Sequence, residues 1–290
     1  MRRVLLCGAV VCVASCGGGD STPTFRPTTQ PASVVLVGAG DIAQCGSPGA
    51  EMTAKLLDNI QGIVFTAGDN AYFQGSAQDY RNCYDPAWGR HKDRTRPVPG
   101  NHEYDTPGAV AYYAYYGAAA GPSGVGYYSY RAGPWHVLAL NSNVSMDENS
   151  AQIQWMRNEL SMSGAGCTAA IFHHPPFSSG PNGDQMASRA LWRELHAGGV
   201  DVAIAAHDHL YERFAPLDGG GRPDAARGVR LFVVGTGGAT LYPIMRFSPN
   251  SEVRLATFGV LKLTLSQAGY QWEFLPGEGG ARDAGSGVCH

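Results

Sequence analysis

The sequence predicts a protein of the α/β class, because two kinds of segment alternate along the first two thirds of the chain. One kind is a short, continuous apolar run such as Val-Val-Leu-Val at 34–37, which is typical of a strand buried on both faces. The other kind spaces its apolar residues along one face of a helix, as residues 51–61 do with Met52, Leu56 and Ile60. Strands that alternate with helices are typical of α/β proteins.

The remaining elements follow from the same two patterns. Buried strands are predicted at 63–65, 136–140, 169–172 and 201–205. Helices are predicted at 151–160 and 185–196. The last part of the chain is mostly strand, with apolar runs at 231–234, 261–265 and 270–274. Because there is no internal repeat and no break in composition after residue 33, we expect one catalytic domain over residues 33–290.

The composition indicates a folded protein without a basic surface. Hydrophobic residues make up 44% and charged residues 16% of the 290 residues, which allows a sizeable core and argues against bulk disorder. The formal net charge is −3, whereas proteins that bind nucleic acid usually carry a basic surface. We therefore expect no nucleic-acid partner.

The first 32 residues predict an export signal and a tether. Arg2 and Arg3 precede an apolar run of eleven residues at 4–14, which is too short to span a bilayer and typical of a signal peptide over residues 1–15. The sequence Val-Ala-Ser-Cys at 13–16 resembles a bacterial lipoprotein signal, in which the chain is cut before a lipid-bearing cysteine. The alternative is an ordinary secretory signal that is cut nearby. With lipid on Cys16 and a flexible tether at 16–32, the protein would be exported from a bacterial cytoplasm and anchored to a membrane.

The cysteines of the predicted mature domain are even in number. Cys7 and Cys12 would leave with the signal peptide, and Cys16 would carry lipid. Four cysteines remain, namely Cys45, Cys83, Cys167 and Cys289. An even count in an exported protein indicates two disulfides, and the sequence alone allows three pairings.

Side chains that bind metals follow the predicted strands. Asp41 and Asp69 come after the first two strands, Asn101 and His102 lie in a later loop, and His173 ends another strand. The pair His207 and His209 follows the next strand. Each alone has an ordinary explanation, such as a cap, a turn or a structural zinc pair. Together they indicate a site for divalent or trivalent ions, because ligand sites form at the carboxyl ends of strands in open α/β sheets.

The order of these motifs resembles the calcineurin-like metallophosphoesterases. The matching motifs are Asp41, Gly68-Asp69-x-x-Tyr72, Gly100-Asn101-His102-Glu103, His173 and His207-x-His209, and the resemblance spans residues 35 to about 215. It implies an αββα sandwich, in which two packed mixed β-sheets are flanked by helices and the metal site lies at the carboxyl ends of strands.

One exchange of residues makes the resemblance more specific. Most of these enzymes carry Asp-x-His in the first motif, whereas this chain has Asp41-Ile42-Ala43. It has Tyr72 three residues after Asp69 instead, as purple acid phosphatases do. The alternative is that Tyr72 is an ordinary half-buried aromatic residue.

The resemblance implies two metal ions in one centre. Asp41, Asp69, Tyr72 and His209 would bind one ion, and Asp69, Asn101, His173 and His207 would bind the other. A phenolate ligand favours a strong Lewis acid, since free tyrosine loses its proton only near pH ~10. The resemblance therefore implies Fe(III) beside a divalent zinc, iron or manganese ion.

The implied reaction is hydrolysis of phosphomonoesters by attack of a metal-bound hydroxide. Asn101 and His102 would bind the phosphate, and His102 would also protonate the leaving group as the catalytic acid. Asn182 takes the place of a substrate-side histidine, and an amide cannot supply a proton. The alternatives are a phosphodiesterase on the same centre and a non-catalytic binding module on the same fold.

The same resemblance pairs the cysteines. The loops that carry Cys45 and Cys83 would both approach one metal ion, so we expect a Cys45–Cys83 disulfide. Cys167 opens the strand that ends at His173, and Cys289 would then tie the tail to it.

Overall fold

A computed structural model describes residues 33–290 of the chain. The predicted signal peptide, the lipidated Cys16 and the tether lie outside the described residues. Within residues 33–290, no helix has both the length and the apolar character needed to cross a membrane.

The first sheet has six strands in the order β13-β12-β11-β1-β2-β3. Its members are β1 (Ser33–Ala39), β2 (Ile63–Ala67), β3 (Thr95–Val98), β11 (Gly259–Ser266), β12 (Gly269–Pro276) and β13 (Asp283–Val288). The central strand β1 is parallel to β2 and antiparallel to β11, so the sheet is mixed. The carboxyl ends of β1 and β2 therefore lie side by side.

The second sheet has seven strands in the order β10-β8-β9-β7-β6-β5-β4. Its members are β4 (Tyr128–Ala132), β5 (Trp135–Ala139), β6 (Cys167–Ile171), β7 (Val202–Ala205), β8 (Tyr211–Leu217), β9 (Val229–Val234) and β10 (Ser251–Leu255). The strands β5, β6, β7 and β9 are parallel, which brings the carboxyl ends of β6 and β7 together.

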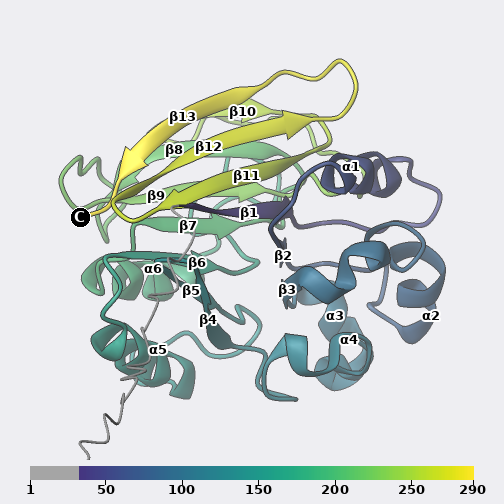
Figure 1. The fold of residues 1–290 in the computed structure, drawn as a ribbon, viewed down its shortest axis with the longest axis horizontal. Coiled ribbons are helices and arrows are strands. Elements are labelled where there is room, and N and C mark those ends of the chain that lie inside the picture. Colours follow the sequence, from purple (N-terminus) through teal and green to yellow (C-terminus); the bar gives the residue numbers. More distant parts are fainter. Residues whose placement is uncertain (1–32) are drawn as a thin grey trace, which may run out of the picture.

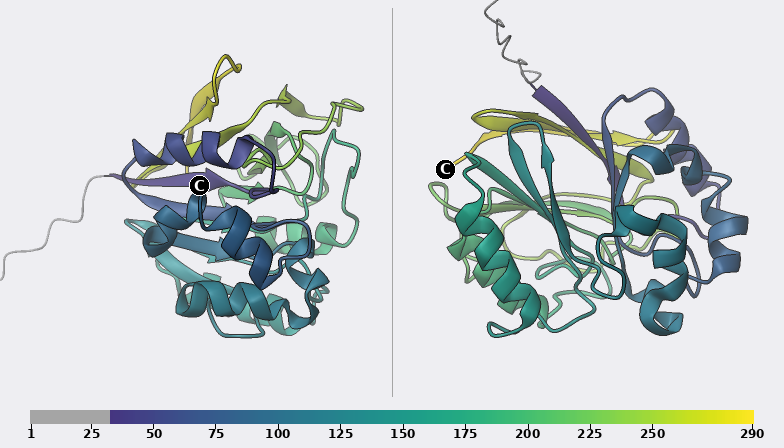
Figure 2. Two further views of the ribbon diagram at one scale, coloured as in Figure 1. Left: turned by 90° about the vertical axis from the view of Figure 1, so that its right-hand side faces the viewer. Right: turned by 60° about the horizontal axis from the view of Figure 1, so that its bottom comes forward.

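The helices lie outside the two sheets, and Figures 1 and 2 show the resulting layers. They are α1 (Gly49–Asp58), α2 (Ala77–Asp79), α3 (Asn101–Asp105), α4 (Val110–Tyr116), α5 (Ala151–Met162) and α6 (Ser188–Ala197). Short non-α turns are η1 (Tyr80–Tyr84), η2 (Trp88–Arg94), η3 (Pro107–Ala109) and η4 (Gly117–Ala120). Helices α1 to α4 lie together on one side, and α5 and α6 lie on the other. The predicted αββα sandwich is confirmed.

Alternation along the strands separates two apolar cores. In β5, Val137 packs into a core shared with Leu36 and Leu261 of the first sheet, so this core lies between the sheets. The next residue, Leu138, packs instead with Leu191 and other residues of α5 and α6. Successive side chains of a strand point to opposite faces, which explains why continuous apolar runs mark these strands.

The predicted elements are present with shifted ends. Helix α1 ends at Asp58 rather than at residue 61, and α6 begins at Ser188 rather than at residue 185. Strands β3, β4, β8, β10 and β13 were not predicted. Strand β3 is four residues long, contains Pro97 and lies at a sheet edge, where proline is tolerated.

The structure contains both expected disulfides. Cys45 is bonded to Cys83 with the Cα atoms 4.9 Å apart, and Cys167 is bonded to Cys289 with the Cα atoms 5.5 Å apart. The first disulfide joins the segments that follow β1 and β2. The second ties the segment after β13 to the start of β6.

Loss of either disulfide is expected to destabilise the fold. The bonds close segments separated by 38 and 122 residues, and chain entropy predicts losses of about 4 and about 5 kcal/mol in the free energy of unfolding. Urea unfolding of the Cys45→Ser/Cys83→Ser and Cys167→Ser/Cys289→Ser variants measures this. A change below about 1 kcal/mol in both would contradict the expected roles.

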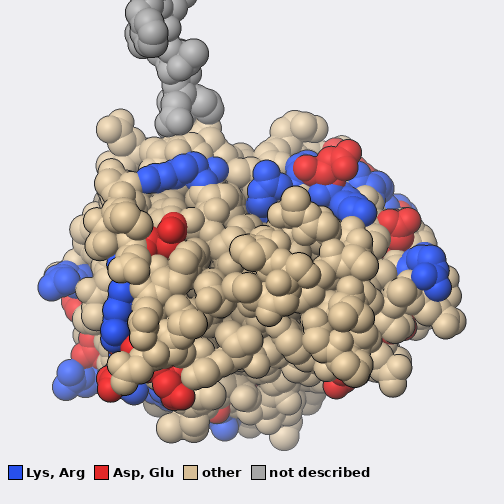
Figure 3. Space-filling model, turned by 90° about the horizontal axis from the view of Figure 1, so that it is seen from below, with Lys and Arg blue, Asp and Glu red and all other residues tan. Residues whose placement is uncertain are grey.

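Charged side chains are sparse on the face that Figure 3 shows. Its central part carries neither basic nor acidic side chains, and the Lys and Arg side chains at its margin are interspersed with Asp and Glu. The absence of a nucleic-acid partner stays a prediction from the sequence.

Candidate metal centre

The two aspartates of the predicted centre lie at the carboxyl ends of adjacent strands. Asp41 follows β1 and Asp69 follows β2, and both have left-handed backbone conformations, with φ of 56° and 49°. Such conformations are costly for residues other than glycine and are concentrated at functional sites. Both side chains are buried, so each aspartate needs a polar or cationic partner.

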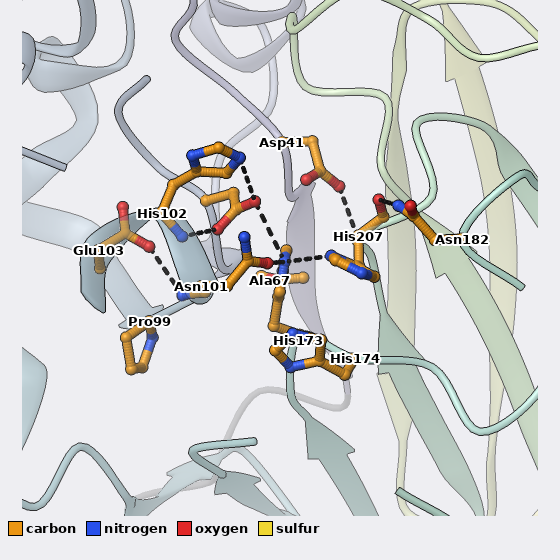
Figure 4. A network of polar contacts seen from close by, with 12 residues as sticks. Asp41, Ala67, Pro99, Asn101, His102, Glu103, His173, His174, Asn182 and His207 are labelled. Carbon is orange, nitrogen blue, oxygen red and sulfur yellow. Dashed lines mark hydrogen bonds and ion pairs between the residues drawn. The ribbon is translucent and has the colours of Figure 1, made fainter. Parts of the chain in front are cut away.

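Four of the other predicted ligands come from three further places. Asn101 begins α3, His173 follows β6, and His207 and His209 follow β7. Figure 4 shows Asn101, His173 and His207 converging, with Asp41 beside them. The two aspartates therefore come from the first sheet, and the three histidines come from the second.

One group of ligand atoms surrounds the phenol of Tyr72. Its oxygen lies 2.8 Å from Asp41 Oδ1, 3.3 Å from Asp69 Oδ2 and 3.1 Å from His209 Nε2. Tyr72 is buried, so it is not the half-exposed aromatic residue of the alternative interpretation. Asp41, Asp69, Tyr72 and His209, which the sequence assigns to one ion, thus converge.

A second group of ligand atoms surrounds His173. Its Nε2 lies 3.2 Å from Asp69 Oδ2, 3.1 Å from Asn101 Oδ1 and 3.2 Å from His207 Nδ1. Asp69 Oδ2 belongs to both groups. The structure therefore brings all seven predicted ligands into two adjoining groups that share one carboxylate oxygen.

Hydrogen bonds on the far side of two imidazoles fix which nitrogen faces the centre. His173 Nδ1 lies 2.8 Å from the backbone oxygen of Ala67, and His209 Nδ1 lies 2.7 Å from that of Thr240. A carbonyl oxygen only accepts, so both Nδ1 atoms carry hydrogen. In the neutral rings, each Nε2 then presents a lone pair toward the centre, as metal-bound histidines do.

The arrangement requires positive charge. With hydrogen on Nδ1, neutral His173 directs a lone pair at two further acceptors, Asp69 Oδ2 and Asn101 Oδ1. Burial lowers the pKa of His173, but the charge of Asp69, its hydrogen bond to the ring, the charge of Asp41 and the hydrogen bond to Ala67 together raise that pKa to about 9. Burial, together with Asp41 and Asp69, raises the pKa of Tyr72 well above its usual value. Two metal ions would supply the positive charge that these side chains require. Carboxylate, phenolate, imidazole and amide ligands suit an iron ion paired with a second ion of zinc, iron or manganese.

The loop that carries Asn101 and His102 is held by a close backbone approach. A Cβ atom on Gly100 would lie 2.1 Å from Asp69 Oδ1, so only glycine fits there. The His102 backbone N–H donates to the same oxygen at 2.9 Å. Buried Glu103 accepts from the N–H groups of Gly100 at 2.7 Å and Asn70 at 2.9 Å, and thereby joins the two ligand loops.

His102, the predicted catalytic residue, is accessible to solvent. Its side chain is 27% exposed, and its Nε2 lies 3.8 Å from Asp69 Oδ2. Its Nδ1 lies 2.5 Å from the backbone oxygen of Phe73, to which it donates. The ring therefore presents Nε2 toward the centre, where it can contact a bound phosphate ester.

Asn182 lies next to the centre but is already engaged. Its side-chain N–H donates to the backbone oxygen of His207 at 2.8 Å (Figure 4), and its backbone N–H donates to Asp208 Oδ1 at 2.9 Å. A substrate-binding role for Asn182 stays a prediction, since its amide nitrogen has a backbone partner.

His174 is close to the centre although no ligand role was predicted for it. Ligand atoms of His173, His174 and His207 lie within 4.8 Å of one another. His174 Nδ1 lies 2.8 Å from Ser142 Oγ, and burial followed by the charges of His173 and His207 lowers its pKa to about 2. His174 is therefore a neutral neighbour of the ligands.

Two residues that contact the centre were missed by the sequence analysis. Thr240 accepts the hydrogen bond from His209 Nδ1 through its backbone. Tyr242 stacks on the His209 ring at 3.9 Å with the planes 5° apart. No motif marks either residue, and both lie more than 30 positions after His209.

An αββα sandwich with two adjoining groups of metal ligands at its strand ends defines a metallophosphoesterase. The chain belongs to the calcineurin-like phosphoesterase family, whose model matches residues 26–211. Members of this family are described as phosphoesterases.

The curated relatives are plant purple acid phosphatases. Purple acid phosphatase 21 of Arabidopsis thaliana is 26% identical over 89% of this chain and 63% of its own length. Purple acid phosphatase 15 of the same plant is 24% identical over 66% of this chain and 42% of its own length. The chain thus spans less than two thirds of these relatives.

Solved structures support the fold. Purple acid phosphatase PPD1 from yellow lupin seeds aligns with a TM-score of 0.77 and 20% identity, covering 89% of this chain and 54% of that one. GAP50 of Plasmodium, described as the anchor in the inner membrane complex, aligns with a TM-score of 0.65 and 14% identity over 90% of this chain and 89% of that one.

Proposed function

We propose that the protein is an exported, metal-dependent phosphatase that hydrolyses phosphomonoesters. The observation that supports this most strongly is the shared position of Asp69 Oδ2, 3.3 Å from the Tyr72 oxygen and 3.2 Å from His173 Nε2. One carboxylate oxygen between two groups of ligands is suited to bridging two ions. The presence of all seven predicted ligands argues against a non-catalytic binding module.

Asp41, Asp69, Tyr72 and His209 would hold an Fe(III) ion, and Asp69, Asn101, His173 and His207 would hold a divalent zinc, iron or manganese ion. Such a pair, when bound, offsets the charge of a phosphate ester and lowers the pKa of water. Asn101 lies at the accessible edge of the second group and is placed to contact the phosphate as well as an ion.

His102 is proposed as the acid that serves the leaving oxygen. Donation from Nδ1 to Phe73 fixes the ring and leaves Nε2 facing the centre. Protonated at Nε2, the imidazolium can give its proton to the departing alcohol. Asp105 Oδ2, 3.3 Å from Nδ1, would stabilise the imidazolium.

The direct test combines metal analysis with two substrates. We expect two ions per chain and faster turnover of 4-nitrophenyl phosphate than of bis(4-nitrophenyl) phosphate. A reversed preference would support the phosphodiesterase alternative. Two bound ions without turnover of either ester would support the non-catalytic alternative.

A visible absorption band that depends on Tyr72 is expected if the proposed Fe(III) site is correct. A phenolate bound to Fe(III) gives a charge-transfer colour, so the purified protein should be coloured and Tyr72→Phe should lose the band. Tyr127→Phe is the control, because this tyrosine packs against Trp155 and makes no contact with the ligands. A colourless, iron-free and fully active wild-type enzyme would contradict the assignment.

Export and a lipid anchor on Cys16 are proposed from the N-terminal pattern. The two disulfides support an oxidising compartment outside the cytoplasm. Mass spectrometry of the mature N-terminus tests the anchor, since a chain that begins after Cys16 could not carry it.

A further inference from the structure

Exposed apolar side chains gather in three loops that adjoin the metal centre. Of the eight exposed large apolar side chains in residues 33–290, five lie in these loops, namely Phe73, Met186, Ile244, Met245 and Phe247. Scattered apolar residues on a surface need no explanation, but a concentration beside a polar site indicates a binding surface.

Each of the three loops is tied to the centre by a residue already described. The first contains Tyr72, and the second contains Asn182, which donates to His207. The third contains Tyr242, whose backbone N–H donates to the backbone oxygen of His209 at 2.9 Å. The second and third loops also adjoin each other, since Met245 N–H donates to the Ser179 oxygen at 3.1 Å.

Phe73 lies on the side of the centre where His102 would act. Its backbone oxygen holds His102 Nδ1, and its ring lies 6.0 Å from that of Tyr72. The ring of His102 is 4.5 Å from Tyr72. The Phe73 side chain is nevertheless 61% exposed, so the fold buries little of it. A group that leaves toward His102 would therefore meet an exposed aromatic ring.

Tyr242 provides a second aromatic ring beside the centre. It is held in place by stacking on His209, whose ring is 5.9 Å from that of Tyr72. The one basic side chain of residues 240–248, Arg246, donates to the Ser178 oxygen and lies 3.3 Å from Asp184 Oδ1. This cation already has partners, so the loop offers a leaving group mainly aromatic and apolar contacts.

We propose that Phe73 and Tyr242 determine specificity by contacting the alcohol part of the substrate, and that this part is aromatic. The inference rests on the proposed phosphatase function and narrows its substrate class. Aromatic rings favour edge-to-face or offset contacts with one another, which a planar leaving group can make and a short alkyl group cannot.

Binding of phosphonates tests this contact without any leaving-group chemistry. Phenylphosphonate and methylphosphonate share the metal-binding head, lack a leaving oxygen and differ in the ring. Isothermal calorimetry on the metal-loaded protein should give phenylphosphonate an advantage of about 10-fold in Kd. Phe73→Ala and Tyr242→Ala should each reduce this advantage to about 3-fold or less, and Phe73→Trp should preserve it.

Val110→Ala is the matched control, because Val110 is also 61% exposed but lies at the start of α4. It should leave both affinities unchanged. An equal Kd for the two phosphonates in the wild type, or equal losses for both in Phe73→Ala, would overturn the inference while the phosphatase function stands. Octylphosphonate binding as tightly as phenylphosphonate would also overturn it, in favour of a general apolar surface. A protein that binds neither phosphonate and turns over neither nitrophenyl ester would overturn both proposals.

Discussion

Replacement of Asp69 by Asn is expected to lower kcat/KM by on the order of 10³-fold or more and to reduce the bound metal below two ions per chain. Asp69 Oδ2 lies in both groups of ligands, and Oδ1 accepts the His102 backbone N–H. One substitution therefore weakens both ion sites and the loop that carries the proposed acid. Metal analysis and steady-state kinetics on 4-nitrophenyl phosphate measure the two effects.

The control for Asp69→Asn is Asp147→Asn. Asp147 is an exposed acid whose side chain accepts a hydrogen bond from nearby Ser145, so its loss should change neither metal content nor rate. An Asp69→Asn enzyme that keeps two ions and wild-type kcat/KM would show that Asp69 does not bridge the centre.

His102→Ala should slow hydrolysis of alkyl phosphates by about 10²–10⁴-fold and that of aryl phosphates far less. An alkoxide is a poor leaving group that needs a proton, whereas a nitrophenolate leaves without one. The measurement is the ratio of kcat/KM for glycerol phosphate and 4-nitrophenyl phosphate in wild type and variant. His196→Ala is the control, since His196 pairs with Asp224 away from the ligands.

Asn182→His completes this experiment. If the position near His207 can serve the leaving oxygen, a histidine there should raise activity on glycerol phosphate more than on the aryl ester. Asn182 donates a hydrogen bond to the backbone oxygen of His207, and the variant loses this bond. The comparison must therefore use the ratio of the two activities rather than either activity alone. An unchanged ratio of the two activities would show that position 182 does not govern leaving-group protonation.

The sequence predicted the central strands, and the residues that it proposed as metal ligands lie close together in the fold, for a physical reason. Strands buried on both faces need continuous apolar runs, and their carboxyl ends are where a polar side chain such as Asp41 or His173 becomes conspicuous. Strand β13 escaped prediction because its sequence, Asp-Ala-Gly-Ser-Gly-Val, is largely exposed and has no apolar pattern. Its position depends on pairing with β12.

Contacts between residues that are distant in the sequence are the part of the site that the sequence could not predict. Glu103 belongs to one of the matching motifs, but only the fold shows that it joins Asn70 to Gly100. Tyr242 gave no signal, since its stacking on His209 depends on how the segment after β9 returns to the centre. Such contacts arise from tertiary structure and leave no periodic pattern in the sequence.

Because the proposed ligands come from both sheets, metal binding would also affect the stability of the folded protein. Asp41 and Asp69 leave the first sheet, and His173, His207 and His209 leave the second, so ions that bind all five would crosslink the two halves of the sandwich. Ligands that bind only the folded state stabilise it by mass action, by about 2.7 kcal/mol at a free concentration 100 times Kd. Metal supply would then govern resistance to proteolysis, and a chain starved of ions would be lost to degradation as well as inactive.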